Sequence, residues 1–300
     1  MPEKRHPWRG YFLIAAATFC WGGAATLGKG IFEGRIFPGL PRISPLVLTQ
    51  TRTTIAVLLL ILFLLLRHGP GMFRISKPDL LLCALIGTLG LAGSNFFYYW
   101  AIQKTTVAAA ITVQYTAPIW VLLFMVARGR QVATWQRILA VLLCLVGVAL
   151  VMGLFSDIKL NTPGILAAML AAFSFSFYNI FGQELVTRNH PLKVMSYALL
   201  SSAILWLILN PPWRLVAQHF TAPQWGFLLL FAGLSMLLPY ISYFNGLKYL
   251  DSTRAVVTSS LEPVFAIVLA ALFLNEGLRG LQAAGIAAVL IATIMIQDRQ

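Results

Sequence analysis

The stretch TSSLEPVFAIVLAALFLNE runs from Thr258 to Glu276 and carries a carboxylate, Glu262, and a proline, Pro263, inside an otherwise apolar segment. An apolar run of about 17–25 residues is long enough to cross a bilayer as a helix. If the helix starts near Ser252, Glu262 lies about 15 Å along it, near the middle of a hydrocarbon core about 30 Å thick. A charge at that depth costs at least about 2.5–3.5 kcal/mol. The carboxylate therefore needs a partner, a proton or access to water.

The composition of the whole chain requires lipid as its surroundings. Of 300 residues, 59% are hydrophobic and 10% are charged, whereas soluble domains carry about 25% charged residues. The net charge of +13 is scattered over short loops without a dense basic arm, which argues against a nucleic-acid partner. The three cysteines lie in apolar spans and the four histidines in terminal or loop segments. Neither a metal site nor a cofactor is expected.

Ten segments are predicted to cross the membrane as helices. They cover residues 10–28, 45–66, 80–100, 105–127, 135–153, 164–185, 194–209, 225–247, 253–274 and 280–296. With the N-terminus inside, the inner loops hold roughly twice as many lysines and arginines as the outer loops, and this bias marks the cytoplasmic side. The sequence thus predicts a multi-pass protein of the cell (inner) membrane with both termini in the cytoplasm, either a monomer or a dimer.

The chain also contains an internal repeat. The segments around Pro118 and Pro263 align at one constant offset without a gap, and each half of the chain holds five predicted spans. Because five is odd, the second half must insert upside down relative to the first, as in many secondary transporters. We expect an all-α membrane protein of ten transmembrane helices in two inverted five-helix repeats, residues 1–155 and 160–300.

Several short motifs occur in the same order as in a known family. They are Trp21-Gly22 in the first span, the two proline helices, LEPVF followed by FLNE at 273–276, and LQAAGIAAVLIA at 281–292. With these motifs the chain resembles EamA-type transporters of the drug/metabolite transporter superfamily. It departs from the family at Asn275-Glu276, where Gly-Glu is frequent, and at Gln131, where the matching position of the first half is often acidic. The resemblance implies ten helices in inverted repeats and transport, often export, of small metabolites or amino acids.

Glu262 has two interpretations. Burial disfavours its charged form, so it could exchange a proton for substrate; alternatively it is a protonated glutamate that bonds across helices and holds the bundle together. Pro263 and Pro118 lack an N–H and so free the carbonyls of Ser259 and Gln114. Such carbonyls are tolerated in membranes where protein or cavity water satisfies them. We expect hinges at both prolines, with either a pocket wall or packing as their purpose.

Arg52 is the other charge inside a span, about 10 Å below its outer end. It could extend outward to the interface. It could instead face the centre and meet Glu262 or an anionic group of the substrate, for which a guanidinium is well suited. Gln50, close by on the same helix, would add a donor.

Further polar and aromatic side chains are candidates for lining a substrate path. Asn95 and Tyr99 lie in the third span, Asn179 in the sixth and Tyr240 in the eighth, while Trp21 belongs to the first. Aromatic residues near span ends are more often interfacial anchors. The full set of predicted substrate-binding residues is Trp21, Arg52, Asn95, Tyr99, Gln114, Tyr115, Asn179, Tyr240, Ser259 and Glu262.

The leading function is a secondary active transporter that exports a small metabolite or amino acid by alternating access, with proton coupling possible. An intramembrane enzyme would need a nucleophile with a base, paired aspartates or metal ligands within the spans. The sequence places no histidine or aspartate deep in a span and only one glutamate, so we expect no enzyme. A passive channel and a membrane scaffold without transport are the remaining alternatives.

Overall fold

The computed structural model of the protein describes residues 6–32, 45–105, 107–153, 161–217, 220–274 and 277–297. Helices joined by turns and short connections make up these residues, and none of them lies in a β-strand. The predicted all-α class is therefore confirmed. Asn275-Glu276, at the end of the FLNE motif, lies outside the described residues.

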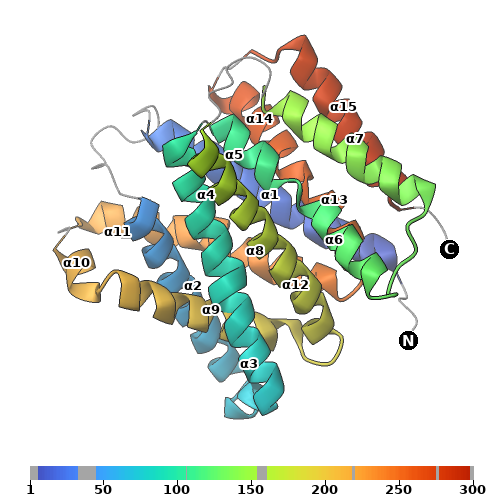
Figure 1. Ribbon diagram of the computed structural model, residues 1–300. Helices are drawn as coiled ribbons and strands as arrows, with labels where there is room; N and C mark the ends of the chain where they lie inside the picture. Colours follow the sequence, from blue (N-terminus) through green and yellow to red (C-terminus); the bar gives the residue numbers. More distant parts are fainter. Residues whose placement is uncertain are drawn as a thin grey trace.

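The first half of the chain contributes helices to the bundle shown in Figure 1. They are α1 (Pro7–Phe32), α2 (Pro45–His68), the short η1 (Pro70–Phe73), α3 (Lys77–Leu85), the π-helix η2 (Ile86–Ala92), α4 (Gly93–Lys104), α5 (Val107–Gln114), α6 (Ala117–Ala127) and α7 (Trp135–Val151). The second half contributes α8 (Thr162–Val186), α9 (Pro191–Leu209), α10 (Pro212–Val216), α11 (Ala222–Ala232), the π-helix η3 (Gly233–Leu237), α12 (Leu238–Leu247), α13 (Ser252–Ser259), α14 (Leu261–Leu274) and α15 (Gly280–Met295).

Within the described residues, eight helical segments are long and apolar enough to cross a membrane. They are Pro7–Leu27, Leu46–His68, Lys77–Ile102, Ala108–Ala127, Thr162–Val186, Pro191–Leu209, Ala222–Leu247 and Ser252–Phe273. The two remaining predicted spans correspond to α7 and α15, which are apolar but shorter. A membrane protein is thus established, while the number of ten spans stays a prediction.

Local sequence explains where several helices begin. Ser76, Thr134, Asn161 and Asp251 each cap a helix by accepting a hydrogen bond from a backbone N–H of its first turn. Such caps satisfy donors that have no partner inside the helix. Prolines occupy the first turn of α3, α8, α9 and α11, where a missing N–H costs nothing.

The contacts between helices interlock the two halves of the chain. α1 packs against α12, α13 and α14, and in a matching way α8 packs against α4, α5 and α6. α2 packs against α9. Each half therefore places its first long helix against the third and fourth predicted spans of the other half, so neither half buries its apolar faces alone.

Helices α7 and α15 lie side by side at one edge of the bundle (Figure 1). Gly147 and Gly285 permit their close approach, because a Cβ on Gly285 would lie 2.7 Å from the Gly147 carbonyl oxygen. Ala140, earlier in α7, and Ala292, later in α15, belong to one buried cluster. The two helices therefore run antiparallel, with small residues at both places of contact.

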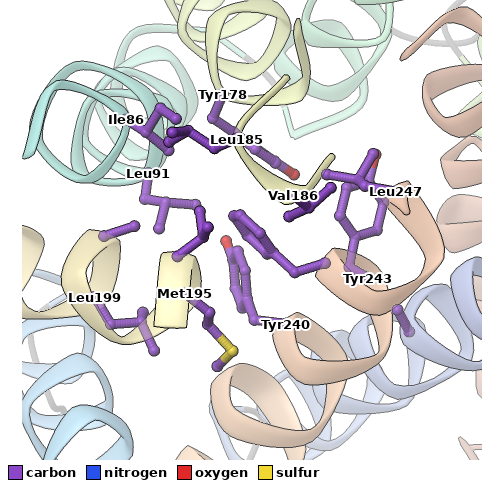
Figure 2. Close-up of a cluster of buried hydrophobic side chains, with 14 of the residues drawn as sticks. Ile86, Leu91, Tyr178, Leu185, Val186, Met195, Leu199, Tyr240, Tyr243 and Leu247 are labelled. Atoms are coloured by element: carbon purple, nitrogen blue, oxygen red, sulfur yellow. The ribbon is translucent and has the colours of Figure 1, made fainter. Parts of the chain in front are cut away.

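The largest buried cluster joins residues of both halves at the centre of the bundle. Figure 2 shows Tyr178, Tyr240 and Tyr243 among aliphatic side chains such as Leu91 and Leu199. Tyr243 and Tyr178 are 0% and 2% exposed. This core fixes α8 and α12 against α9 and the π-helix η2, and it forms one side of the polar centre described next.

Candidate functional site

Two helices are interrupted at corresponding places near the centre of the bundle. α5 ends at Gln114 and α6 begins at Ala117, so the interruption falls on Tyr115 and Thr116. The second interruption falls on Ser260, between α13 and α14. Each one begins three residues before a proline, Pro118 or Pro263, and both prolines are buried. Because proline has no N–H to donate to the preceding turn, the carbonyl groups of Gln114 and Ser259 receive no helical hydrogen bond from it.

Glu262 lies in the first turn of α14, immediately after the second interruption, and it is half-buried. The Tyr115 hydroxyl lies 2.9 Å from the Glu262 carboxylate and 3.3 Å from the Ser259 carbonyl oxygen. Ser259 is the residue whose carbonyl Pro263 leaves without a helical donor. Tyr115 thus connects the interruption of the first half to that of the second half.

Arg52 on α2 turns toward the interior rather than outward along its helix. Its Nη2 donates to Oδ1 of Asn95 on α4 at 2.6 Å, and Nδ2 of Asn95 donates to the Leu91 carbonyl at 2.7 Å. Asn95 is therefore held with its oxygen toward the guanidinium. The Arg52 Nε is buried without a hydrogen-bond partner. Among the described residues, Arg52 forms no direct ion pair with Glu262.

Gln50 does not supply the additional hydrogen-bond donor beside Arg52 that the sequence predicted. Gln50 is fully buried and pairs with Asn210 at the end of α9: its Nε2 donates to the Asn210 carbonyl at 2.6 Å, and its Oε1 accepts from Nδ2 of Asn210. Its side chain therefore ties α2 to α9 and is unable to assist Arg52. The sequence could not indicate this, because Asn210 lies in the connection after the predicted seventh span.

Gln114 and Tyr99 extend the polar region along α4 and α5. Nε2 of Gln114 donates to the Ser94 hydroxyl at 3.3 Å, which links the end of α5 to the beginning of α4. Tyr99 is half-buried, and its ring lies 5.3 Å from that of Tyr98. Ser94 was not predicted as a site residue, and a single serine among apolar residues gives little signal.

An aromatic wall borders this region on the side of α1 and α12. The Trp21 ring lies 5.2 Å from that of Tyr240 and 5.3 Å from that of Tyr243. Tyr243 donates to Oδ1 of Asn179, whose Nδ2 donates to the Phe175 carbonyl at 2.7 Å. Asn179 is 0% exposed. Its side chain therefore supports Tyr243 and makes its hydrogen bonds within the protein.

The other charged and phenolic groups of this region lie close enough to one another to interact electrostatically. Glu262 and Arg52 interact with each other, and Tyr98 and Tyr240 interact with both of them. The structure thus brings Arg52, Asn95, Tyr240 and Glu262 together, although they come from four different helices. We call Arg52, Asn95, Tyr98, Tyr115, Tyr240 and Glu262 the polar centre.

A second polar region, unforeseen from the sequence, joins the halves at the end of the bundle that carries the predicted inner loops. Asp79 on α3 accepts from Arg188 Nε at 2.9 Å and from Asn189 Nδ2 at 2.9 Å. Arg130, after α6, pairs with Glu184 on α8 at 2.9 Å. We call Asp79, Arg130, Glu184, Arg188 and Asn189 the inner-end network.

Three further hydrogen bonds reinforce the inner-end network across the same boundary. They are Lys193 Nζ to the Arg74 carbonyl at 2.7 Å, Tyr197 hydroxyl to the Phe73 carbonyl at 2.6 Å, and Thr253 hydroxyl to Gln131 Oε1 at 2.7 Å. In each pair one residue comes from the first half and the other from the second half of the chain. Acidic residues are rare in this sequence, so Asp79 and Glu184 at the ends of predicted spans are the features from which this network could have been predicted.

The chemistry of the polar centre suits the binding of a polar ligand. It offers guanidinium N–H groups, one carboxylate, one amide and phenol groups on an apolar background. Among the residues that the structure describes, no group of three or more His, Cys, Asp or Glu side chains could hold a metal ion.

Several known proteins are similar to this chain. The threonine/homoserine exporter RhtA of Escherichia coli K12 is 27% identical over 297 residues, which cover 97% of this chain and 92% of that protein. A transporter of Archaeoglobus fulgidus is 28% identical over 234 residues, or 75% of this chain and 79% of the relative. A crystal structure with 21% identity shares the fold at a TM-score of 0.77, with 96% of both chains covered. The EamA-like transporter family matches twice, over residues 8–153 and 162–297, and the chain belongs to this family.

Proposed function

We propose that the protein is a secondary active transporter that exports a small metabolite or amino acid by alternating access. The observation that carries the proposal is the polar centre, in which Arg52 and Glu262 face one region beside two interrupted helices. Ionisable groups inside a membrane protein are costly and mark substrate or ion pathways. In transporters, interrupted helices supply backbone groups to a site near the midplane.

The interlocked contacts support two inverted repeats of five spans, residues 1–155 and 160–300. α1 against α12 to α14 mirrors α8 against α4 to α6. The π-helices η2 and η3 lie in corresponding spans, as do the two interruptions. Antiparallel packing of α7 on α15 is what an upside-down copy requires. In this proposal α7 and α15 are the fifth and tenth spans, and both termini face the cytoplasm of the inner membrane.

The groups of the polar centre favour a substrate that carries both charges. Arg52 has donors left over after its bond to Asn95, including a buried Nε, and a guanidinium matches a carboxylate. Glu262 could bind an ammonium group, and Trp21, Tyr99 and Tyr240 offer apolar surface to a side chain. An α-amino acid combines these features. Gln114 and Ser259 lie within the same region, whereas Asn179 supports Tyr243 from behind.

The inner-end network supports the alternating part of the proposal. Its bonds join the two halves across one end of the bundle, and in this proposal they hold that end closed. Exposed ion pairs each contribute about 0–1 kcal/mol. A closure made of several such pairs can break and form again as the halves rock against each other about Pro118 and Pro263.

Counterflow in proteoliposomes tests the proposal directly. Vesicles loaded with unlabelled substrate are diluted into labelled substrate, using a panel that begins with threonine and homoserine, the substrates in the relative's name. A carrier accumulates label transiently, because exchange is faster than net movement. Saturable counterflow with at least one amino acid supports the proposal; equilibration without an overshoot would indicate a channel, and no movement across a broad panel would contradict transport.

Replacing Glu262 with glutamine is expected to abolish the acceleration of transport by a pH gradient. Glutamine has nearly the size of glutamate, and its amide oxygen can still accept the hydrogen bond from Tyr115. Its side chain cannot bind and release a proton near neutral pH. Gradient-free counterflow should persist at a reduced rate. Uptake with and without a pH gradient measures the effect. If Glu262→Gln responds to the gradient like the unmodified protein, Glu262 does not handle the proton.

Replacing Asp79 with asparagine is expected to weaken the inner-end closure and to expose Cys83. Cys83 lies on α3 in the buried cluster shared with α9 and is 0% exposed. Loss of the charge removes the Arg188 pair and weakens the Asn189 bond, which corresponds to about a two- to tenfold shift toward the open form. In a chain with Cys20→Ala and Cys144→Ala, an impermeant maleimide applied to inside-out vesicles should label Cys83 faster by this factor.

Asp251→Asn is the matched control for the labelling experiment. Asp251 lies at the same end, but its ion pair with Arg254, at 3.4 Å, is within the second half. Asparagine can also cap α13 in its place. Labelling of Cys83 should stay at the rate of the unmodified protein. Equal rates in Asp79→Asn and Asp251→Asn would show that the inner-end network does not hold the halves together.

A further inference from the structure

Tyr115 occupies a special place in the bundle, because it belongs to one helix interruption and touches the other. Its hydroxyl lies within hydrogen-bond distance of two acceptors, the Glu262 carboxylate at 2.9 Å and the Ser259 carbonyl at 3.3 Å. A phenol has one hydrogen to donate. It therefore cannot satisfy both acceptors fully at the same time.

The protonation state of Glu262 decides between the two acceptors. An ionised carboxylate only accepts, so it takes the Tyr115 hydrogen in a charge-assisted bond. A protonated carboxyl group can itself donate to the Tyr115 oxygen. The Tyr115 hydrogen is then free for the Ser259 carbonyl, which has no helical donor because of Pro263. Both arrangements keep every hydrogen paired, and they differ in which part of the second interruption is bound to the first half.

We propose that Tyr115 is the positioning residue that transmits the proton state of Glu262 to the junction of the two halves. The proposal rests on the proposed transport function and adds the residue through which proton binding changes the interruption at Ser260. The proton on Glu262 comes from water and returns to water, while Tyr115 keeps its own hydrogen and only changes acceptor. Pairing with Ser259 should stabilise one orientation of α14 relative to α6, and pairing with ionised Glu262 the other.

Other ionisable groups around Glu262 do not offer the same link. Arg52 on α2 interacts with Glu262 through space but bonds to Asn95. α15 carries no ionisable side chain. Four further tyrosines interact electrostatically with Glu262: Tyr98 on α4, Tyr178 on α8, and Tyr240 and Tyr243 on α12. The helices packed against α14 also carry Arg9, Tyr11 and Cys20 on α1, Arg137 and Cys144 on α7, and Arg254 on α13. Among the described residues, Tyr115 alone is hydrogen-bonded to the Glu262 carboxylate.

Tyr115→Phe tests the inference because it removes the hydroxyl and keeps the ring, which packs edge-on against Phe175 at 6.2 Å between centroids. Counterflow and gradient-driven uptake would be measured between about pH 5 and 9. Because Tyr115 belongs to the polar centre, we expect Tyr115→Phe to lower counterflow without a gradient by about three- to tenfold. In addition, the remaining transport should lose most of the acceleration that a pH gradient gives to the unmodified protein. The double variant with Glu262→Gln should behave like Glu262→Gln alone, since both changes break one link.

Tyr178→Phe is the matched control, because it removes a phenol hydroxyl from the adjacent core without touching a bond to Glu262. It should keep the pH response of the unmodified protein. A second readout is independent of transport: pH-difference infrared spectra should contain a carboxylic-acid band that disappears in Glu262→Gln and shifts in Tyr115→Phe. An unchanged pH response and an unshifted band in Tyr115→Phe would overturn the inference. Absence of any pH response in the unmodified protein would instead contradict proton coupling itself.

Discussion

Replacing Arg52 with methionine is expected to lower transport of a carboxylate-bearing substrate by about 10- to 100-fold. Methionine fills a similar volume but removes the guanidinium that we assign to the substrate carboxylate. Hydrogen bonds to charged groups contribute about 1.5–3 kcal/mol, and each 1.4 kcal/mol corresponds to about a tenfold change. The change also leaves Oδ1 of Asn95 without the donor that now lies at 2.6 Å. The loss of the guanidinium and the loss of the donor to Asn95 both affect the polar centre.

The measurement for Arg52 is the concentration dependence of counterflow, compared with two variants. Arg52→Lys keeps a charge but not the planar fork, so it should recover part of the lost activity. Arg67→Met removes a basic residue from the last turn of the same helix and should leave counterflow within about twofold. Full activity of Arg52→Met in correctly folded protein would exclude a role for Arg52 in substrate binding.

The sequence predicted the helical class and the positions of the eight long spans because these depend on apolar runs alone. Pro118 and Pro263 also pointed to the places where the helices are interrupted, since proline removes a backbone donor whatever the surroundings. Membership of the EamA-like family was likewise visible in motifs around these prolines. Features of this kind are local in the chain, so they can be read without knowing the tertiary contacts.

The partners of the polar side chains could not be read in the same way. Gln50 was expected to add a hydrogen-bond donor beside Arg52, but its side chain pairs with Asn210, a residue far away in the chain. The Tyr115 hydroxyl reaches Ser259 and Glu262 only because α6 and α13, which are far apart in the chain, pack against each other. Hydrogen-bond partners in a bundle depend on helix rotation and on shifts of a few ångströms. Periodicity and composition do not determine either quantity for a single sequence.

A small residue on α1, Gly22, connects a motif that is visible in the sequence with the geometry of the site. Gly22 follows Trp21 on α1, and the Trp21-Gly22 motif contributed to the resemblance without a stated physical role. The structure supplies one: Gly22 lies directly on the backbone of the turn that begins with Glu262. The Thr26 hydroxyl, one turn later, lies 3.1 Å from the Ala266 carbonyl oxygen. α1 thus sets the position of α14, and with it the position of the carboxylate.

Replacing Gly22 with alanine is therefore expected to destabilise the protein by about 1–3 kcal/mol, the usual cost of overpacking a close contact. A Cβ at this position would lie 2.8 Å from the Ala266 nitrogen and 2.9 Å from the Glu262 carbonyl oxygen. Both are backbone atoms, so relief requires α1 and α14 to separate. The gain of up to about 1 kcal/mol that alanine normally brings to a helix is too small to offset this. Counterflow should fall as the Glu262 turn shifts away from Tyr115.

Gly23 provides the control within the same helix. A Cβ on Gly23 would meet only a side-chain atom of Leu269, at an ordinary contact distance of 3.7 Å. Gly23→Ala should therefore leave the midpoint of thermal unfolding in detergent unchanged or slightly higher, with transport retained, while Gly22→Ala lowers both. If both variants unfold at the same temperature as the unmodified protein, α1 does not determine where α14 holds Glu262.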